Sequence, residues 1–115
     1  MALYNQLPVY KTSYDLLVKI FEFTKQFTRE YKYTIGEKLK NETVDMMSNI
    51  YRANSRREKA PLLEKSRENI EVIRLYLRLL RDLRQVNPRT FVDINQLIES
   101  VSKQLTAWHK SVQPR

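Results

Sequence analysis

The chain has 115 residues, the size of one ordinary domain, and its 21 Lys and Arg residues outnumber its 13 Asp and Glu residues, giving a net charge of +8. One glycine and four prolines are too few for the many tight turns of a sheet-rich domain, so an all-α fold is expected. The absence of cysteine excludes disulfides and thiolate metal sites and is typical of a reducing cytoplasm.

The first predicted helix covers about residues 9–28. Its apolar and aromatic residues recur at helical spacing and share one face, which we interpret as the side that packs in the core. These residues are Tyr10, Tyr14, Leu17, Ile20, Phe21 and Thr24. No run of about 18 apolar residues occurs here or elsewhere in the chain, so no membrane span is expected.

The second predicted helix covers about residues 34–54 and begins with a T-x-x-E sequence. In such a capping box, the side chains of Thr34 and Glu37 each satisfy a free backbone donor at the helix start. An inner line then recurs at steps of three and four, formed by Leu39, Thr43, Met46 and Ile50. The polar and basic segment that follows, residues 54–61, is predicted to be a loop.

The third predicted helix covers about residues 58–85, since Ser55 and Glu58 have capping-box spacing and Pro61 suits only a first helical turn. Asn87 is expected to cap the fourth helix, residues 88–112, with Pro88 at its first position. That helix carries a heptad seam made of Phe91, Ile94, Ile98, Val101, Leu105, Trp108 and Val112.

Four long helices with short connections predict one domain over residues 1–115, folded as an antiparallel up-down-up-down four-helix bundle. The third helix is unusual because its apolar residues cover an arc of about 220°, whereas a core-facing stripe needs only about 100°. We therefore expect the surplus apolar surface to form the interface of a homo-oligomer. The predicted interface residues are Val72, Leu75, Tyr76 and Leu79.

The positive charge is concentrated in residues 51–86, where ten Lys and Arg stand against five Asp and Glu, a balance of +5. A narrow stripe on the third helix consists of Arg67, Arg74, Arg78 and Arg81, and the preceding loop adds Arg56, Arg57 and Lys59. Arginine suits phosphate recognition, and neutralising several phosphates gives salt-dependent affinity, so these residues are predicted to contact a nucleic-acid backbone. The alternative is a solvated face with weak surface ion pairs.

No catalytic or metal site is expected. His109 is the single histidine, and we interpret it as a surface or packing residue because a zinc site needs several His or Cys ligands. The single glycine excludes a glycine-rich phosphate loop. The chain is therefore predicted to be a non-enzyme with no cofactor, no metal and no small-molecule substrate.

Several segments, taken in order, resemble a known family. They are Leu7-Pro8-Val9-Tyr10, Asn49-Ile50, the run from Leu75 to Leu83, and Leu105-Thr106-Ala107-Trp108. The set resembles the four-helix proteins encoded with ribosomal intervening sequences and, more closely, the accessory variability proteins of diversity-generating retroelements. Tyr51-Arg52-Ala53 stands where the ribosomal branch tends to have Ala-Glu-Gly, which favours the retroelement branch.

The resemblance implies a cytoplasmic, prokaryotic or phage-encoded accessory protein that forms a barrel-like homopentamer. It implies association with a reverse transcriptase and binding of RNA or DNA, to which Arg74, Arg78 and Arg81 would contribute, in support of copying a template RNA into mutagenised cDNA. Two alternatives stay open. One is a protein–protein adaptor whose basic third helix docks an acidic partner, and the other is an RNA-processing enzyme, for which no cluster of acidic or His residues is found.

Overall fold

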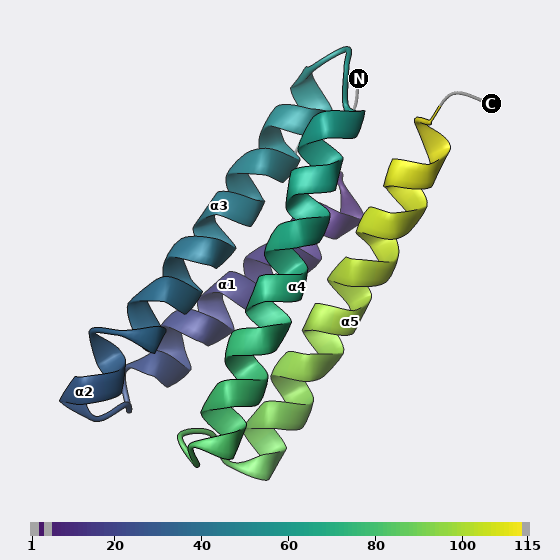
Figure 1. The fold of residues 1–115 in the computed structure, drawn as a ribbon. Helices are drawn as coiled ribbons and strands as arrows, with labels where there is room; N and C mark the ends of the chain where they lie inside the picture. Colours follow the sequence, from purple (N-terminus) through teal and green to yellow (C-terminus); the bar gives the residue numbers. More distant parts are fainter. Residues whose placement is uncertain (1–2, 4–5, 114–115) are drawn as a thin grey trace.

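The computed structural model describes Leu3 and residues 6–113; residues 1–2, 4–5 and 114–115 of the predicted domain lie outside the described residues. The described part of the chain contains the helices α1 (Pro8–Thr24), α2 (Arg29–Lys32), α3 (Ile35–Ser55), α4 (Ala60–Asp82) and α5 (Pro88–Ser111). The four long helices run antiparallel in chain order and form a bundle of 46 × 21 × 20 Å (Figure 1). No strand occurs among these residues, so the predicted all-α four-helix architecture is confirmed.

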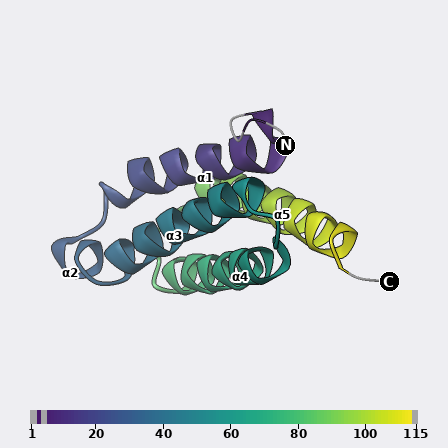
Figure 2. The same cartoon turned by 90° about the horizontal axis from the view of Figure 1, so that it is seen from above.

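Each long helix packs mainly against two others. The contacts join α1 to α3 and α5, and α4 to α3 and α5, so α1 and α4 stand at opposite sides of the bundle (Figure 2). Within the described residues, none of the helices combines the length and the apolar character that crossing a bilayer requires.

The core is built from one line of side chains per helix. The inner line predicted for α3 is confirmed, since Leu39, Thr43, Met46 and Ile50 are all fully buried. The heptad of α5 is confirmed as well, because its central members are buried and its outer members pack, partly buried, against the core. The central members are Ile94, Ile98, Val101 and Leu105, and the outer ones are Phe91, Trp108 and Val112.

The prediction for the first helix is wrong in its end and in part of its inner face, although Ile20 and Thr24 are buried as predicted. α1 ends at Thr24, and Tyr14 and Phe21, which were predicted to be inside, are 52% and 43% exposed. The buried line consists of Val9, Ser13, Leu16, Ile20, Phe23 and Thr24. Both lines have helical spacing, so periodicity alone does not choose between them.

The connection between α1 and α3 contains the short helix α2, and the predicted capping box at its end does not form. Thr34 Oγ1 donates to Glu30 O at 2.6 Å instead of capping α3, a local hydrogen bond that competes with the cap. Gly36 lies where the two segments meet, and a Cβ there would stand 3.0 Å from Tyr31 O and 3.3 Å from the Phe27 ring. The only glycine of the chain therefore permits the close packing of this corner.

The two remaining connections differ in how well the sequence predicts them. Asn87 caps α5 as expected, because its side-chain oxygen accepts a hydrogen bond from Thr90 N at 2.8 Å. The predicted Ser55–Glu58 box is wrong, since Ser55 Oγ donates to Arg52 O at the end of α3. α4 begins at residue 60 and ends at residue 82, so it is shorter at both ends than the predicted 58–85.

Candidate nucleic-acid interface

The four arginines predicted to form a stripe lie along one flank of α4. That flank borders α5, because three of them reach side chains of α5. The contacts are Arg67–His109, Arg74–Glu99 and Arg81–Phe91. Helical spacing therefore predicts the shared flank correctly, but the stripe follows the seam between α4 and α5 rather than the outermost surface of α4. Its capacity to hold phosphates depends on the partners of each guanidinium.

Arg74 is engaged on both sides within the molecule, and 23% of its side chain is exposed. Its guanidinium lies 2.5 Å from Glu71 Oε1 and 2.8 Å from Glu99 Oε1. Burial opposes its charge, but the hydrogen bonds and attraction of Glu71 and Glu99 outweigh burial, so the pKa of Arg74 is raised above its ordinary value. Arg74 is thus a charged link between α4 and α5 whose charge is already compensated.

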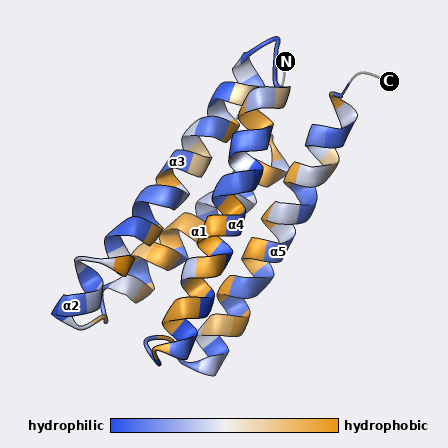
Figure 3. Cartoon of the chain, viewed as in Figure 1, coloured by the Kyte–Doolittle hydropathy of each residue, from blue (hydrophilic) through white to orange (hydrophobic). Residues whose placement is uncertain are grey.

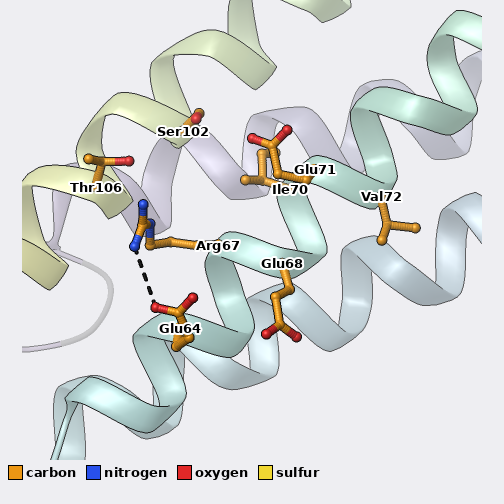
Figure 4. A pocket seen from close by; sticks show the side chains of 8 residues that line it. All are labelled: Glu64, Arg67, Glu68, Ile70, Glu71, Val72, Ser102 and Thr106. Atoms are coloured by element: carbon orange, nitrogen blue, oxygen red, sulfur yellow. Dashed lines mark hydrogen bonds and ion pairs between the residues drawn. The ribbon is translucent and has the colours of Figure 1, made fainter.

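Arg67 is also held by neighbours in the bundle. Its Nη1 atom lies 3.4 Å from Glu64 Oε2 and 3.2 Å from His109 Nδ1, and His109 Nε2 lies 3.1 Å from the same carboxylate. Figure 4 shows Arg67 extending toward α5 across a cleft that also carries Glu68 and Glu71. The acidic lining makes this part of the seam unsuited to a polyanion. His109 is buried, as expected of a packing residue.

The last turns of α4 offer more accessible cations. Arg78 is exposed and makes no ion pair with any residue of the described part of the chain. Arg81 pairs with Asp82 at 3.2 Å, and its guanidinium carbon lies 4.9 Å from the centroid of the Phe91 ring. About half of the Arg81 side chain, 48%, is nevertheless exposed. The C-terminal end of α4 is therefore the part of the stripe that a phosphate can approach.

The loop between α3 and α4 contributes cations of two kinds. Arg56 and Arg57 are exposed and form no ion pair within residues 6–113. Lys59 Nζ instead donates to the carbonyl oxygens of Ala53, Asn54 and Arg56 at 2.8, 3.1 and 2.7 Å. A cation at these carbonyls caps the C-terminus of α3, where the helix dipole favours positive charge. All three ammonium donors of Lys59 are thus committed to the fold, a role that the sequence analysis did not anticipate.

The structure does not bring the seven predicted residues into one patch. Because a helix rises about 1.5 Å per residue, Arg57 and Arg81 lie about 35 Å apart along the bundle. Between them, Arg67 and Arg74 are compensated by carboxylates. The accessible cations therefore form two groups, which we call the loop end (Arg56 and Arg57) and the turn end (Arg78 and Arg81).

The sequence analysis missed Arg84, which extends the turn end. α4 closes with a Schellman motif, in which Gln85 N donates to Leu80 O at 2.8 Å and Arg84 N donates to Arg81 O at 2.9 Å. Arg84 occupies the left-handed position of this motif, with a φ of 60°, where glycine is usual. Helical spacing does not locate Arg84, because the backbone leaves the helical path after Asp82. The sequence did contain one signal: no glycine occurs between the end of α4 and Asn87, so a residue with a side chain must take the left-handed position that ends the helix.

A family model described as bAvd-like matches residues 7–112, a range that includes all the helices. The chain belongs to the bAvd-like family. This result confirms the resemblance to accessory variability proteins, which are accessory proteins rather than known catalysts. No curated protein matches the chain. Among the described residues of this bAvd-like chain, no group of three or more His, Cys, Asp or Glu side chains is placed to hold a metal ion.

The bAvd-like chain exposes apolar side chains on α4, as the sequence analysis predicted. Leu75 is 58% exposed and Leu79 is also exposed, whereas Val72 and Tyr76 are half-buried. In Figure 3 the hydrophobic colour is prominent in the half of α4 that lies nearest the start of α5. Leu75 and Leu79, flanked by the half-buried Val72 and Tyr76, form an apolar surface on this helix, which we call the α4 face.

A second apolar surface spans α1 and α3, and it includes Tyr14 and Phe21, which were predicted to lie in the core. Its exposed members are Tyr14, Val18, Phe21, Val44 and Tyr51. Lys40 of α3 lies over the Phe21 ring of α1, with its Nζ atom 5.3 Å from the ring centroid, so the two helices contribute to one surface. Such a group exceeds the scattered apolar residues that are normal on a monomer, and we call it the α1–α3 face.

Proposed function

We propose that this protein is an accessory variability determinant of a diversity-generating retroelement. It would be a non-catalytic, oligomeric protein of a prokaryotic cytoplasm that binds RNA or cDNA together with a reverse transcriptase. Its role would be to hold the strand against the polymerase while the template RNA is copied into mutagenised cDNA. Membership of the bAvd-like family supports the accessory role.

The observation that carries the nucleic-acid part is positive charge that the fold leaves uncompensated. Arg56 and Arg57 at the loop end and Arg78 at the turn end are exposed and form no ion pair within the described residues. Each phosphate that such a side chain neutralises releases condensed counterions, so binding should weaken as salt is added. Because backbone contacts carry little sequence information, this surface suits a protein that must handle variable sequences.

The two apolar faces support self-association through unlike surfaces. The α4 face carries the exposed acids Glu68 and Glu71 close to Leu75. On the α1–α3 face, Lys40 stands over Phe21. A contact between the two faces would bring this cation to Glu68, which forms no ion pair among the described residues, whereas Glu71 is paired with Arg74. A contact between unlike faces repeats from copy to copy and closes into a ring when the rotation allows it. We propose such a ring, with five copies as the family resemblance implies.

Retention of mixed-sequence RNA on filters at increasing salt tests the nucleic-acid part. We expect the affinity to fall steeply with salt, and the combined change Arg57→Glu and Arg78→Glu to lower both the affinity and its salt dependence. A matched control is Lys19→Glu with Lys103→Glu, which makes the same charge change at exposed positions of α1 and α5. Salt-insensitive retention, or equal losses in the two double variants, would contradict the proposed site.

In the adaptor alternative, the basic α4 helix docks an acidic partner protein, and the same exposed arginines, such as Arg78, would make that contact. The two functions are separated by copurification with the reverse transcriptase, with and without nuclease treatment. If no RNA is retained at low salt and the polymerase still copurifies after nuclease treatment, the protein is an adaptor. If RNA is retained and nuclease releases the polymerase, the strand itself joins the two proteins.

A further inference from the structure

An open cleft lies where the end of α4 meets the start of α5. Its lining includes Arg81, Arg84, Asn87, Pro88, Phe91 and Val92, and no carboxylate belongs to it. Val92 is half exposed, and Phe91 is partly exposed. The cleft therefore joins an apolar wall to two cations. The cleft near Arg67, by contrast, is lined by three glutamates.

The Arg81 guanidinium lies over the Phe91 ring at this cleft. The guanidinium carbon lies 4.9 Å from the ring centroid, and the Nε and Nη2 atoms each lie 3.2 Å from Asp82 Oδ1. The guanidinium is thus oriented by one ring and one carboxylate, while about half of the side chain remains exposed. Bases of nucleic acids stack on arginine planes as well as on aromatic rings, so a base would extend this stack.

Arg84 gives an independent indication of function at the same cleft. Its left-handed backbone conformation, with a φ of 60°, is one that glycine adopts freely and that a residue with a Cβ disfavours. A long cationic side chain nevertheless occupies this position and lines the cleft beside Arg81. Residues held in such conformations cluster at functional sites. The Schellman motif that ends α4 thus places this cationic side chain at the cleft.

We propose that this cleft holds one unpaired nucleotide of the bound strand, with its base stacked on the Arg81–Phe91 pair and its phosphates beside Arg84 and Arg78. The inference rests on the proposed nucleic-acid function and adds that the strand is unpaired at this point. A duplex presents phosphates but no free base surface, so it reaches the arginines without using the stack. Every base has a flat aromatic surface, so the cleft accepts all of them.

Replacing Arg81 by lysine separates stacking from charge, because lysine keeps the positive charge but lacks the planar guanidinium. The probe is a short single-stranded RNA that contains 2-aminopurine, whose fluorescence falls when the base stacks. We expect the wild-type protein to quench this probe. We expect Arg81→Lys to lose the quenching and about tenfold of the single-strand affinity, and to bind a duplex of equal length as the wild type does. Arg29→Lys, at an exposed position of α2, is the matched control and should change neither.

A second variant, Phe91→Leu, removes the ring and keeps an apolar side chain against the core, and it should show the same selective loss. If circular dichroism shows that Phe91→Leu is unfolded, the Arg81→Lys variant alone tests whether a base stacks in the cleft. If Arg81→Lys retains both quenching and affinity, the nucleotide cleft is overturned while the proposed nucleic-acid function stands. If the wild type binds neither strand form, both are overturned. If, in that case, Arg81→Lys also weakens copurification with the polymerase, the cleft is a protein contact.

Discussion

Arg84 occupies a backbone conformation that its residue type disfavours, and this has a measurable consequence for stability. We predict that Arg84→Gly raises the free energy of unfolding by about 1 kcal/mol, because glycine adopts the left-handed conformation without a clash at Cβ. Arg84→Ala keeps the clash and should stay close to the wild type. Urea denaturation of the three proteins measures the difference. Equal stability of the glycine and alanine variants would show that the backbone is not strained.

Ser13 is fully buried in α1, and its hydroxyl has no hydrogen-bond partner among the described residues. We predict that Ser13→Ala raises the free energy of unfolding by about 1 kcal/mol, because it removes a buried polar group that nothing satisfies. Ser66 of α4 is the matched control, since it is equally buried but its Oγ donates to Leu62 O at 2.9 Å. Thermal unfolding measures both. If Ser66→Ala stabilises as much, helix propensity and not the lone hydroxyl is the cause.

The partners of single residues were the least predictable part of the candidate site. Arg74 and Arg78 occupy equivalent positions on a helical wheel, and sequence reasoning treated them alike. They differ because Arg74 is held between Glu71 of α4 and Glu99 of α5, whereas Arg78 meets neither. Spacing along one helix predicts which residues share a flank, but the packing of a second helix decides which of them remain free. Lys59 was assigned to the basic patch for a similar reason, because its sequence position does not show that carbonyl groups at the end of α3 take its donors.

Among the helices, prediction succeeded where one apolar line stands alone and failed where two compete. α5 has a single heptad seam, and its central members, such as Ile98 and Val101, are buried as predicted. α1 has two adjacent lines of helical spacing, and the choice between Tyr14 and Leu16 as the inner residue depends on how near α3 and α5 approach. That distance is a property of the assembled bundle, so no window of sequence contains it.

Lys59 stabilises the end of a helix rather than the basic surface, and this assignment is testable. We predict that Lys59→Met lowers the free energy of unfolding by about 1 kcal/mol, because the last carbonyl groups of α3 lose their charged partner. Lys65→Met is the matched control, since Lys65 is an exposed lysine on α4. Chemical denaturation measures both variants. A Lys59 variant as stable as the Lys65 variant would contradict the capping role.

For the molecule as a whole, the sequence predicted the architecture well and the distribution of charge poorly. Helix number, order and antiparallel arrangement follow from hydrophobic spacing and short connections, and the structure confirms them. The charge balance of residues 51–86 suggested one basic patch, whereas Arg57 precedes the start of α4 and Arg78 lies near its end. Carboxylates of α4 and α5 neutralise the centre. The net charge of residues 51–86 therefore suggested a polyanionic partner, but it did not show which residues would contact that partner.

The proposed ring can be tested because its two unlike contact surfaces, the α4 face and the α1–α3 face, can be altered separately. We expect the wild-type protein to form a closed oligomer, and Leu75→Glu on the α4 face or Phe21→Glu on the α1–α3 face to yield monomers, since each puts a charge into an apolar contact. Each variant still has one intact face. Mixed in equal amounts, they should therefore form dimers and nothing larger, which light scattering coupled to gel filtration measures. A mixture that stays monomeric would show that the two faces do not bind each other, and single variants that still form rings would place the interface elsewhere.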